Sequence, residues 1–146
     1  MKYKKIGLFL LLTFSAIALK SQAFYGDVDQ KVQFGASLYG YGNGFSGSYD
    51  KGLSDYFSLG FGADLYLNET NNKDTNFYLF GRFNGHLGGF LKLPLELDVY
   101  PGATLGITGD RLGYGLFGGI RYFFTESLGL YAELGNQGRV GLSFSF

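Results

Sequence analysis

The chain has 146 residues, with 12 basic and 12 acidic residues in balance and 46% hydrophobic residues, so it is long enough for one domain. Its aromatic fraction of 19% argues against intrinsic disorder. The absence of cysteine excludes disulfides, thiol catalysis, thiolate metal sites and lipid attachment through a cysteine.

The first 23 residues have the pattern of a secretory signal peptide. A basic start precedes an apolar run over residues 6–19, and Ser21 and Ala23 occupy the −3 and −1 positions of a cleavage site. We therefore expect residues 1–23 to be removed and residues 24–146 to form the mature domain, with an uncleaved membrane anchor as the alternative. Removal takes four lysines and no acidic residue, so the formal charge moves from zero to −4, which argues against nucleic acid as a partner.

Beyond residue 30 the sequence alternates apolar and polar side chains with a period of two, which is typical of β-strands. Breaks rich in glycine, asparagine and serine separate the alternating segments, and no helical period follows the apolar run. Pro101 lacks a backbone N–H and predicts a bulge in the fifth strand. The eight expected strands span residues 31–41, 45–51, 57–67, 77–86, 95–108, 112–123, 128–135 and 139–146.

The two faces of these strands differ in chemistry. One face carries aliphatic and aromatic side chains beside glycine. We assign the charges within the strands to the opposite face, together with serine, asparagine, glutamine and several tyrosines. The residues that we expect to form a polar cluster on this face are Asp64, Arg82, His86, Glu96, Asp98, Arg121 and Glu133.

Alternation alone does not say which face points outward, because a soluble barrel buries its apolar face and a membrane barrel exposes it to lipid. Aromatic residues of the apolar face gather toward both ends of the strands, with aliphatic residues between them, as interfacial girdles do. An even number of antiparallel strands also lets the first pair with the last, which leaves no unpaired edge in lipid. We therefore predict an all-β fold, an eight-stranded antiparallel up-and-down transmembrane β-barrel.

The last residues carry a second signal. The alternation of Val140, Leu142, Phe144 and the terminal Phe146 resembles the C-terminal signal by which outer-membrane barrel proteins are recognised for assembly. Nearly all of residues 24–146 resembles the small outer-membrane β-barrel proteins of Gram-negative bacteria, especially those of the Bacteroidota type. The stretches that carry this resemblance most clearly are residues 97–103, 118–124 and 131–135.

The resemblance implies a location in the outer membrane of a Gram-negative bacterium. It also implies contact with outer-membrane lipid and lipopolysaccharide, and with the barrel assembly machinery during biogenesis. This group of proteins is largely of uncharacterised function, so the resemblance implies no particular activity.

The polar face would fill the lumen of the barrel. An eight-stranded barrel is only wide enough for its own side chains, which argues against an open pore. We interpret the polar cluster as structural, with its charges satisfying one another; a cluster that responds to protons or a ligand is the alternative, since histidine titrates near neutral pH. Hairpins centred near Leu91 and Ser127 predict the pairs His86–Glu96, Asn84–Asp98 and Arg121–Glu133.

A catalytic role would have to use His86, which is the single histidine of the chain. Membrane-barrel hydrolases place a nucleophile, a histidine and an acid on an exposed surface near the membrane boundary, whereas we expect His86 inside, near the periplasmic end. No spacing of histidines and carboxylates indicates a metal site. We therefore expect neither enzymatic activity nor a cofactor or metal.

The hypothesis that follows is a non-enzymatic integral outer-membrane protein of structural or interaction type. One alternative is an outer-membrane enzyme acting on lipid or lipopolysaccharide, with His86 essential. Another is a soluble periplasmic barrel that binds an apolar ligand. Residues 68–76 form the largest expected outer connection, which is either a solvated connection or a contact for a ligand or partner.

Overall fold

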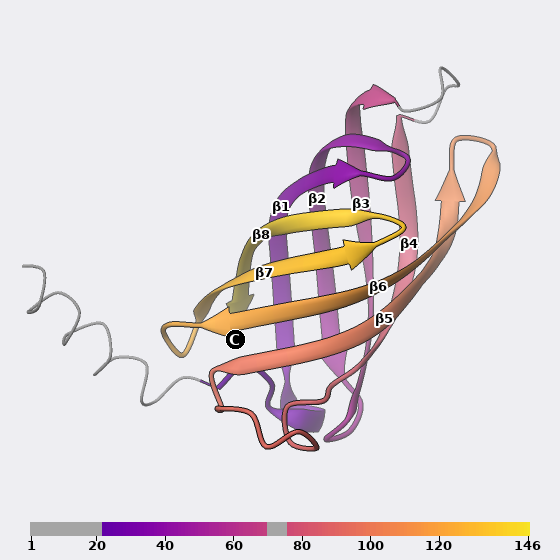
Figure 1. Ribbon diagram of the computed structural model, residues 1–146. Helices are drawn as coiled ribbons and strands as arrows, with labels where there is room; N and C mark the ends of the chain where they lie inside the picture. The colour runs from indigo at the N-terminus through magenta and orange to yellow at the C-terminus, as the bar shows by residue number, and fades with distance from the viewer. Residues whose placement is uncertain (1–21, 70–75) are drawn as a thin grey trace, which may run out of the picture.

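The computed structural model describes residues 22–69 and 76–146 of the chain (Figure 1). Most of the predicted signal peptide, residues 1–21, lies outside the described residues. The same holds for residues 70–75 of the predicted outer connection. No helix within the described residues is long and apolar enough to cross a membrane.

Eight antiparallel strands close into one barrel, which confirms the predicted all-β fold and its strand order. Each strand pairs with the next along the chain, and β8 returns to pair with β1 (Figure 1). A short 3₁₀ helix, η1 (Gly26–Val28), precedes the barrel. The strands are β1 (Gln30–Tyr39), β2 (Gly42–Gly52), β3 (Phe57–Glu69), β4 (Phe77–Gly85), β5 (Leu97–Thr108), β6 (Arg111–Phe123), β7 (Leu128–Gly135) and β8 (Gly138–Ser145).

The two ends of the barrel differ. We call the end at which β1 begins and β8 ends the proximal mouth; η1 and the connection between β4 and β5 lie there. The opposite, distal end carries the short turns between β1 and β2, β5 and β6, and β7 and β8. The β1–β2 turn lies at residues 40–41 rather than at 42–44, because Gly40 has a φ of 119°, which a residue with a Cβ rarely adopts. The second strand is therefore longer than predicted.

Side chains alternate between the lumen and the outer surface along the strands, as the period of two predicts. The lumen side is polar: Arg82 is 2% exposed and Glu133 is fully buried. The outer side is apolar, with Phe61 65% and Leu116 63% exposed. The assignment of all strand charges to the polar face is wrong for Lys51, which lies at the end of β2 in phase with the outer side chains and is partly exposed.

The bulge predicted at Pro101 is absent. Pairing of β5 with β6 continues through Pro101, which lies opposite Gly118, without a change of register. On the other side, the paired residues of β4 and β5 end at Asn84 and Gly102, and one further hydrogen bond joins Leu87 N to Val99 O. Pro101 therefore occupies a gap in the ladder to β4, where no N–H is needed, and the strand stays regular.

Glycines on the lumen face make room for large buried side chains. Gly119 is buried in β6, and a Cβ at this position would overlap the ring of Tyr100. The neighbouring Gly118 points outward, and a Cβ there would meet nothing within 4 Å. Both glycines have ordinary negative φ, so their substitution tests packing and not backbone strain.

We expect Gly119→Ala to lower the free energy of unfolding by about 1–3 kcal/mol, because Tyr100 is fully buried and cannot move without disturbing its neighbours. The matched variant Gly118→Ala is expected to change stability by less than about 1 kcal/mol. Urea titration of the refolded barrel measures both. Equal effects of the two substitutions would contradict the packing of Tyr100 against β6.

Candidate functional site

The lumen holds a continuous set of buried charged side chains, contributed by β1 to β8. They arise because each strand places every second residue inside, and each strand has one arginine, lysine, aspartate or glutamate buried at such an inner position. The three arginines are the largest of the fully buried side chains, each 1% or 2% exposed. Among the described residues, the buried acidic, basic and histidine side chains of the lumen and its proximal mouth are Asp29, Lys31, Asp50, Asp64, Arg82, His86, Asp98, Arg121, Glu133 and Arg139.

Arg82 lies at the centre of this network. Its Nη2 donates to Glu133 Oε1 at 2.6 Å, and its Nε lies 3.0 Å from Asp50 Oδ1. The hydroxyl of Tyr100 donates to the same Oε1 of Glu133 at 3.0 Å. Arg82 thus connects β4 to β2 and β7 across the lumen. Neither β2 nor β7 is a neighbour of β4 in the sheet, so backbone hydrogen bonds do not join them to it.

A second pair joins β3 to β8. Arg139 Nε and Nη2 donate to both carboxylate oxygens of Asp64, at distances from 2.7 to 3.1 Å. This fork geometry is the strongest form of an arginine–carboxylate pair. Arg139 Nη1 also lies 3.7 Å from Glu133 Oε2, so the pair is continuous with the network around Arg82.

Arg121 links the central network to the proximal mouth. Its guanidinium lies 3.5 Å from Asp50 and 3.6 Å from Asp98, and it packs on the ring of Tyr100 with a centroid distance of 4.4 Å. Aromatic faces support the other arginines in the same way: Arg82 packs on Phe117 and Arg139 on Phe80. Cation–π contact in a desolvated site adds to the charge pairing.

His86 forms a hydrogen-bonded chain near the proximal mouth. Its Nδ1 lies 2.8 Å from Asp98 Oδ2, and its Nε2 lies 2.8 Å from the hydroxyl of Ser58. Asn84 Nδ2 donates to the same hydroxyl at 3.1 Å. The side chains of Asn84 and His86 both point into the lumen. His86 lies just beyond the end of β4, but its backbone N–H donates to Tyr56 O, so the alternation of β4 continues to this residue.

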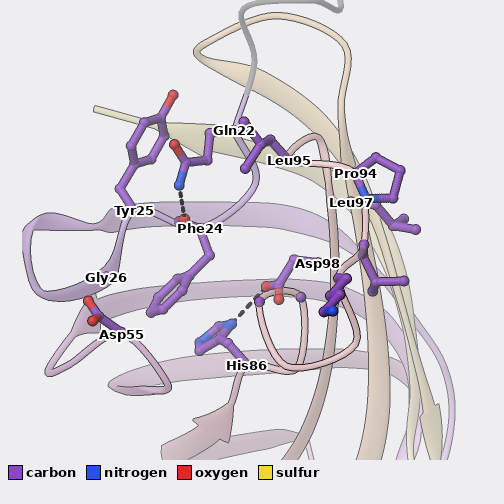
Figure 2. A pocket seen from close by; sticks show the side chains of 14 residues that line it. Gln22, Phe24, Tyr25, Gly26, Asp55, His86, Pro94, Leu95, Leu97 and Asp98 are labelled. Carbon is purple, nitrogen blue, oxygen red and sulfur yellow. Dashed lines mark hydrogen bonds and ion pairs between the residues drawn. The ribbon is translucent and has the colours of Figure 1, made fainter.

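The segment before β1 closes the proximal mouth over His86. The ring of Phe24 stacks on the imidazole with a centroid distance of 3.6 Å and an interplanar angle of 7° (Figure 2). Asp29 accepts a hydrogen bond from the ammonium of Lys31, which also faces the rings of Phe24 and Phe123. A pocket of about 310 Å³ remains at this mouth, and Phe24, His86 and Asp98 contribute to its lining (Figure 2).

Six members of the predicted polar cluster are buried in the lumen; they are Asp64, Arg82, His86, Asp98, Arg121 and Glu133. Glu96 is not brought together with them. It precedes β5 at the rim of the proximal mouth, is partly exposed, and uses its backbone carbonyl to accept a hydrogen bond from Phe123.

The predicted partners within the cluster are wrong. Asn84 lies opposite Gly102, not Asp98, because the β4–β5 hairpin is centred two residues later than predicted. His86 consequently contacts Asp98 in place of Glu96. Arg121 lies opposite Tyr131, and Glu133 opposite Gly119, so the predicted pair of Arg121 and Glu133 does not form.

The prediction also omitted several lumen residues. Arg139 and Asp50 belong to the ion-pair network; as charges within the strands they were assigned to the polar face, but they were left out of the predicted cluster. Phe80, Phe117 and Phe123 are buried as well, in phase with neighbouring arginines. Their apolar character hid them, because sorting by hydrophobicity alone assigns a phenylalanine to the outer face.

No set of three or more histidine and carboxylate side chains among residues 22–69 and 76–146 is arranged to hold a metal ion. The charged side chains of the lumen instead contact one another. Breaking one of these ion pairs is costly, since removing one partner leaves the other charge buried and unpaired.

Comparison with known proteins places this architecture in a family. The sequence matches DUF6646, described as a family of unknown function, over residues 14–137. The chain belongs to this family. Among solved structures, the fold of this DUF6646 member is similar to the N-terminal beta-barrel domain of Pseudomonas aeruginosa OprF, with a TM-score of 0.58 and 19% sequence identity over 84% of this chain and 100% of that one. No curated protein matches the sequence.

The ion pair of Asp64 and Arg139 tests the energetics of the lumen. We expect Asp64→Leu or Arg139→Met alone to lower the free energy of unfolding by about 3–5 kcal/mol, because each leaves a buried charge without its main partner. The double variant is expected to be more stable than either single variant. Urea titration of the refolded protein gives all four values.

Asp110→Asn is the matched control for this cycle. Asp110 and Arg111 form an exposed pair at 3.8 Å at the distal end, so this substitution is expected to leave the urea midpoint unchanged. Additive losses in the cycle of Asp64 and Arg139 would show that the two side chains do not depend on each other.

Proposed function

We propose that the protein is an integral β-barrel of a Gram-negative outer membrane, of structural or interaction type, whose lumen is closed by its own side chains. The observation that carries the proposal is the distribution of charge: arginines and carboxylates are buried, while phenylalanines and leucines are exposed. In water this arrangement would be doubly unfavourable, because it exposes apolar surface and desolvates charges. In a bilayer the same outer surface faces lipid.

The outer aromatic residues support this proposal. Phe57, Tyr122 and Phe146 lie toward the proximal end, and Phe45 and Tyr114 lie toward the distal end; all are exposed. Aromatic rings favour the two interfaces of a bilayer, and leucines, with some phenylalanines, occupy the outer positions between them. A soluble barrel holding an apolar ligand has less support, since the described lumen is lined with charges.

The same proposal gives the barrel an orientation and partners. A chain exported through the inner membrane enters the outer membrane from the periplasm, so β1 would begin on the periplasmic side. The short turns of the distal end depart from the usual pattern, in which short turns are periplasmic. The proximal mouth would then face the periplasm, and lipid and lipopolysaccharide would surround the barrel. Phe146 is 70% exposed beside the seam between β8 and β1, a position where the barrel assembly machinery can contact it.

Cell fractionation tests the proposal. The protein is expected in the outer-membrane fraction, and unheated samples are expected to migrate differently from boiled ones on a denaturing gel, because a closed barrel resists detergent until it is heated. Recovery in the soluble fraction without a change in mobility would contradict the proposal.

Two variants of β6 sharpen this measurement. Leu116 lies near the middle of the strand and Leu112 near its distal end, and both are exposed. An arginine costs about 2–4 kcal/mol at the centre of a bilayer and about 0–1 kcal/mol near its surface. Leu116→Arg is therefore expected to reduce the heat-modifiable fraction, whereas Leu112→Arg is expected to preserve it. Equal tolerance of both variants would argue against a bilayer around β6.

A further inference from the structure

Three side chains at the proximal mouth are arranged as a nucleophile, a base and an acid. Ser58 comes from β3, His86 directly follows β4, and Asp98 comes from β5. The hydroxyl of Ser58 lies 2.8 Å from His86 Nε2, and Asp98 Oδ2 lies 2.8 Å from His86 Nδ1. We propose that Ser58, His86 and Asp98 form a catalytic triad that hydrolyses carboxylic esters, and that Phe24 covers it. This inference goes beyond the proposed function and adds an enzymatic activity to the membrane barrel.

The hydrogen bonds around Ser58 fix the direction of its proton. Asn84 Nδ2 donates to the Ser58 oxygen, while Asn84 Oδ1 accepts a hydrogen bond from Arg82 Nη2 at 3.4 Å, which orients the amide. The hydroxyl proton of Ser58 then points to His86 Nε2. Asp98 accepts a hydrogen bond from the Nδ1–H of His86 and so selects the tautomer in which Nε2 accepts the hydrogen bond of Ser58.

This arrangement supports a balanced acyl transfer. The Ser58 oxygen bonds to the ester carbonyl carbon as its proton moves to His86 Nε2, and the alcohol leaves with that proton as the ester C–O bond breaks. Water then attacks the acyl-enzyme: it transfers a proton to His86, its oxygen bonds to the acyl carbon, and Ser58 leaves with the proton. Asn84 Nδ2 donates to the Ser58 oxygen in this structure, so it becomes available to the developing oxyanion as acylation of Ser58 weakens that hydrogen bond.

The setting of these residues differs from that of the other buried polar groups. The central arginines contact carboxylates and aromatic rings inside the closed lumen, whereas His86 and Asp98 border the pocket of about 310 Å³ at the proximal mouth. Leucines and a proline contribute to the same lining, at residues 93–95 and 97 (Figure 2). The lining also includes Gln22, Asp55 and Lys92 but not Ser58. Its apolar part fits a substrate with a small apolar acyl group, which reaches Ser58 when the Phe24 ring moves away from His86.

Phe24 controls access to the triad. Ser58 is fully buried, and the Phe24 ring lies flat against His86. Among residues 22–25, Ala23 N donates a backbone hydrogen bond to Leu95 O in the connection between β4 and β5. Cleavage after Ala23, as the signal-peptide pattern predicts, would remove this bond and leave Phe24 held mainly by stacking.

Labelling with a fluorophosphonate probe tests the triad in outer membranes that carry the full-length protein as expressed. The probe is expected to modify Ser58, as identified by peptide mass spectrometry. Ser58→Ala and His86→Gln are expected to abolish the label, because the serine oxygen is a poor nucleophile without its base. Ser143→Ala is the matched control: Ser143 is equally buried in the lumen, but its hydroxyl has no hydrogen-bond partner among the described residues, so labelling should persist.

Hydrolysis of p-nitrophenyl butyrate gives the second readout. Ser58→Ala is expected to lower the rate at least about a thousandfold, to the background of the membranes. Phe24→Ala and the milder Phe24→Leu are expected to raise both labelling and hydrolysis about fivefold, because they weaken the stacking that covers His86. Heat-modifiability of each variant verifies that the barrel is folded.

Two results would overturn the proposal. One is a folded barrel in which Ser58 stays unlabelled in the wild type and in both Phe24 variants. The other is labelling or hydrolysis that survives His86→Gln, which would mean that the histidine does not activate the serine. Either result leaves the membrane proposal standing, since fractionation tests that proposal separately.

Discussion

When the eight strands close into a barrel, one face of the sheet becomes the lumen and the other becomes the outer surface; here the polar face is the buried one. Because side chains alternate along each strand, turning one charged residue inward turns the whole polar set inward and the apolar set outward. Here β1 pairs with β8, so no edge remains and the lumen is isolated from the surroundings by backbone hydrogen bonds. The charges inside must then find partners among themselves, and the apolar belt outside must find an apolar environment.

The pairing of lumen charges does more than neutralise them. Arg82 contacts carboxylates of β2 and β7, and Arg139 contacts Asp64 of β3, so the ion pairs join strands that are not neighbours in the sheet. A shift in register of one strand would separate several of these pairs together. Buried charge pairs add little net stability on their own, but unpaired alternatives are costly, which favours one register over the others.

The sequence predicted the strands and their faces because a period of two is a local signal. It failed on the partners because pairing depends on the register between strands, which the connections set. The β4–β5 pairing is displaced by four residues from the prediction, and the β6–β7 pairing by two. Both displacements are even, so Arg82, Arg121 and Glu133 kept their predicted side while losing their predicted partners. An odd displacement would have turned them toward the outside.

The approach of Ser58 to His86 was beyond the sequence for a related reason. The two residues are 28 positions apart and lie on neighbouring strands, β3 and the end of β4. The alternation along each strand predicts that both side chains point inward. The distance between them depends on how β3 pairs with β4, which the alternation does not give. Phe24 is different again: it precedes the first strand, where no alternation exists, and its position on His86 follows from the path of η1 into the mouth.

Site-directed spin labelling along β6 tests most directly whether lipid surrounds the barrel. The chain has no cysteine, so each introduced cysteine is a unique attachment point. Labels at Leu112, Leu116 and Ile120 of protein in bilayers would be probed with oxygen, which partitions into lipid, and with a water-soluble nickel complex. A membrane barrel predicts that oxygen dominates at Leu116 and Ile120 and that the nickel complex gains at Leu112. Dominance of the nickel complex at all three positions would contradict the account.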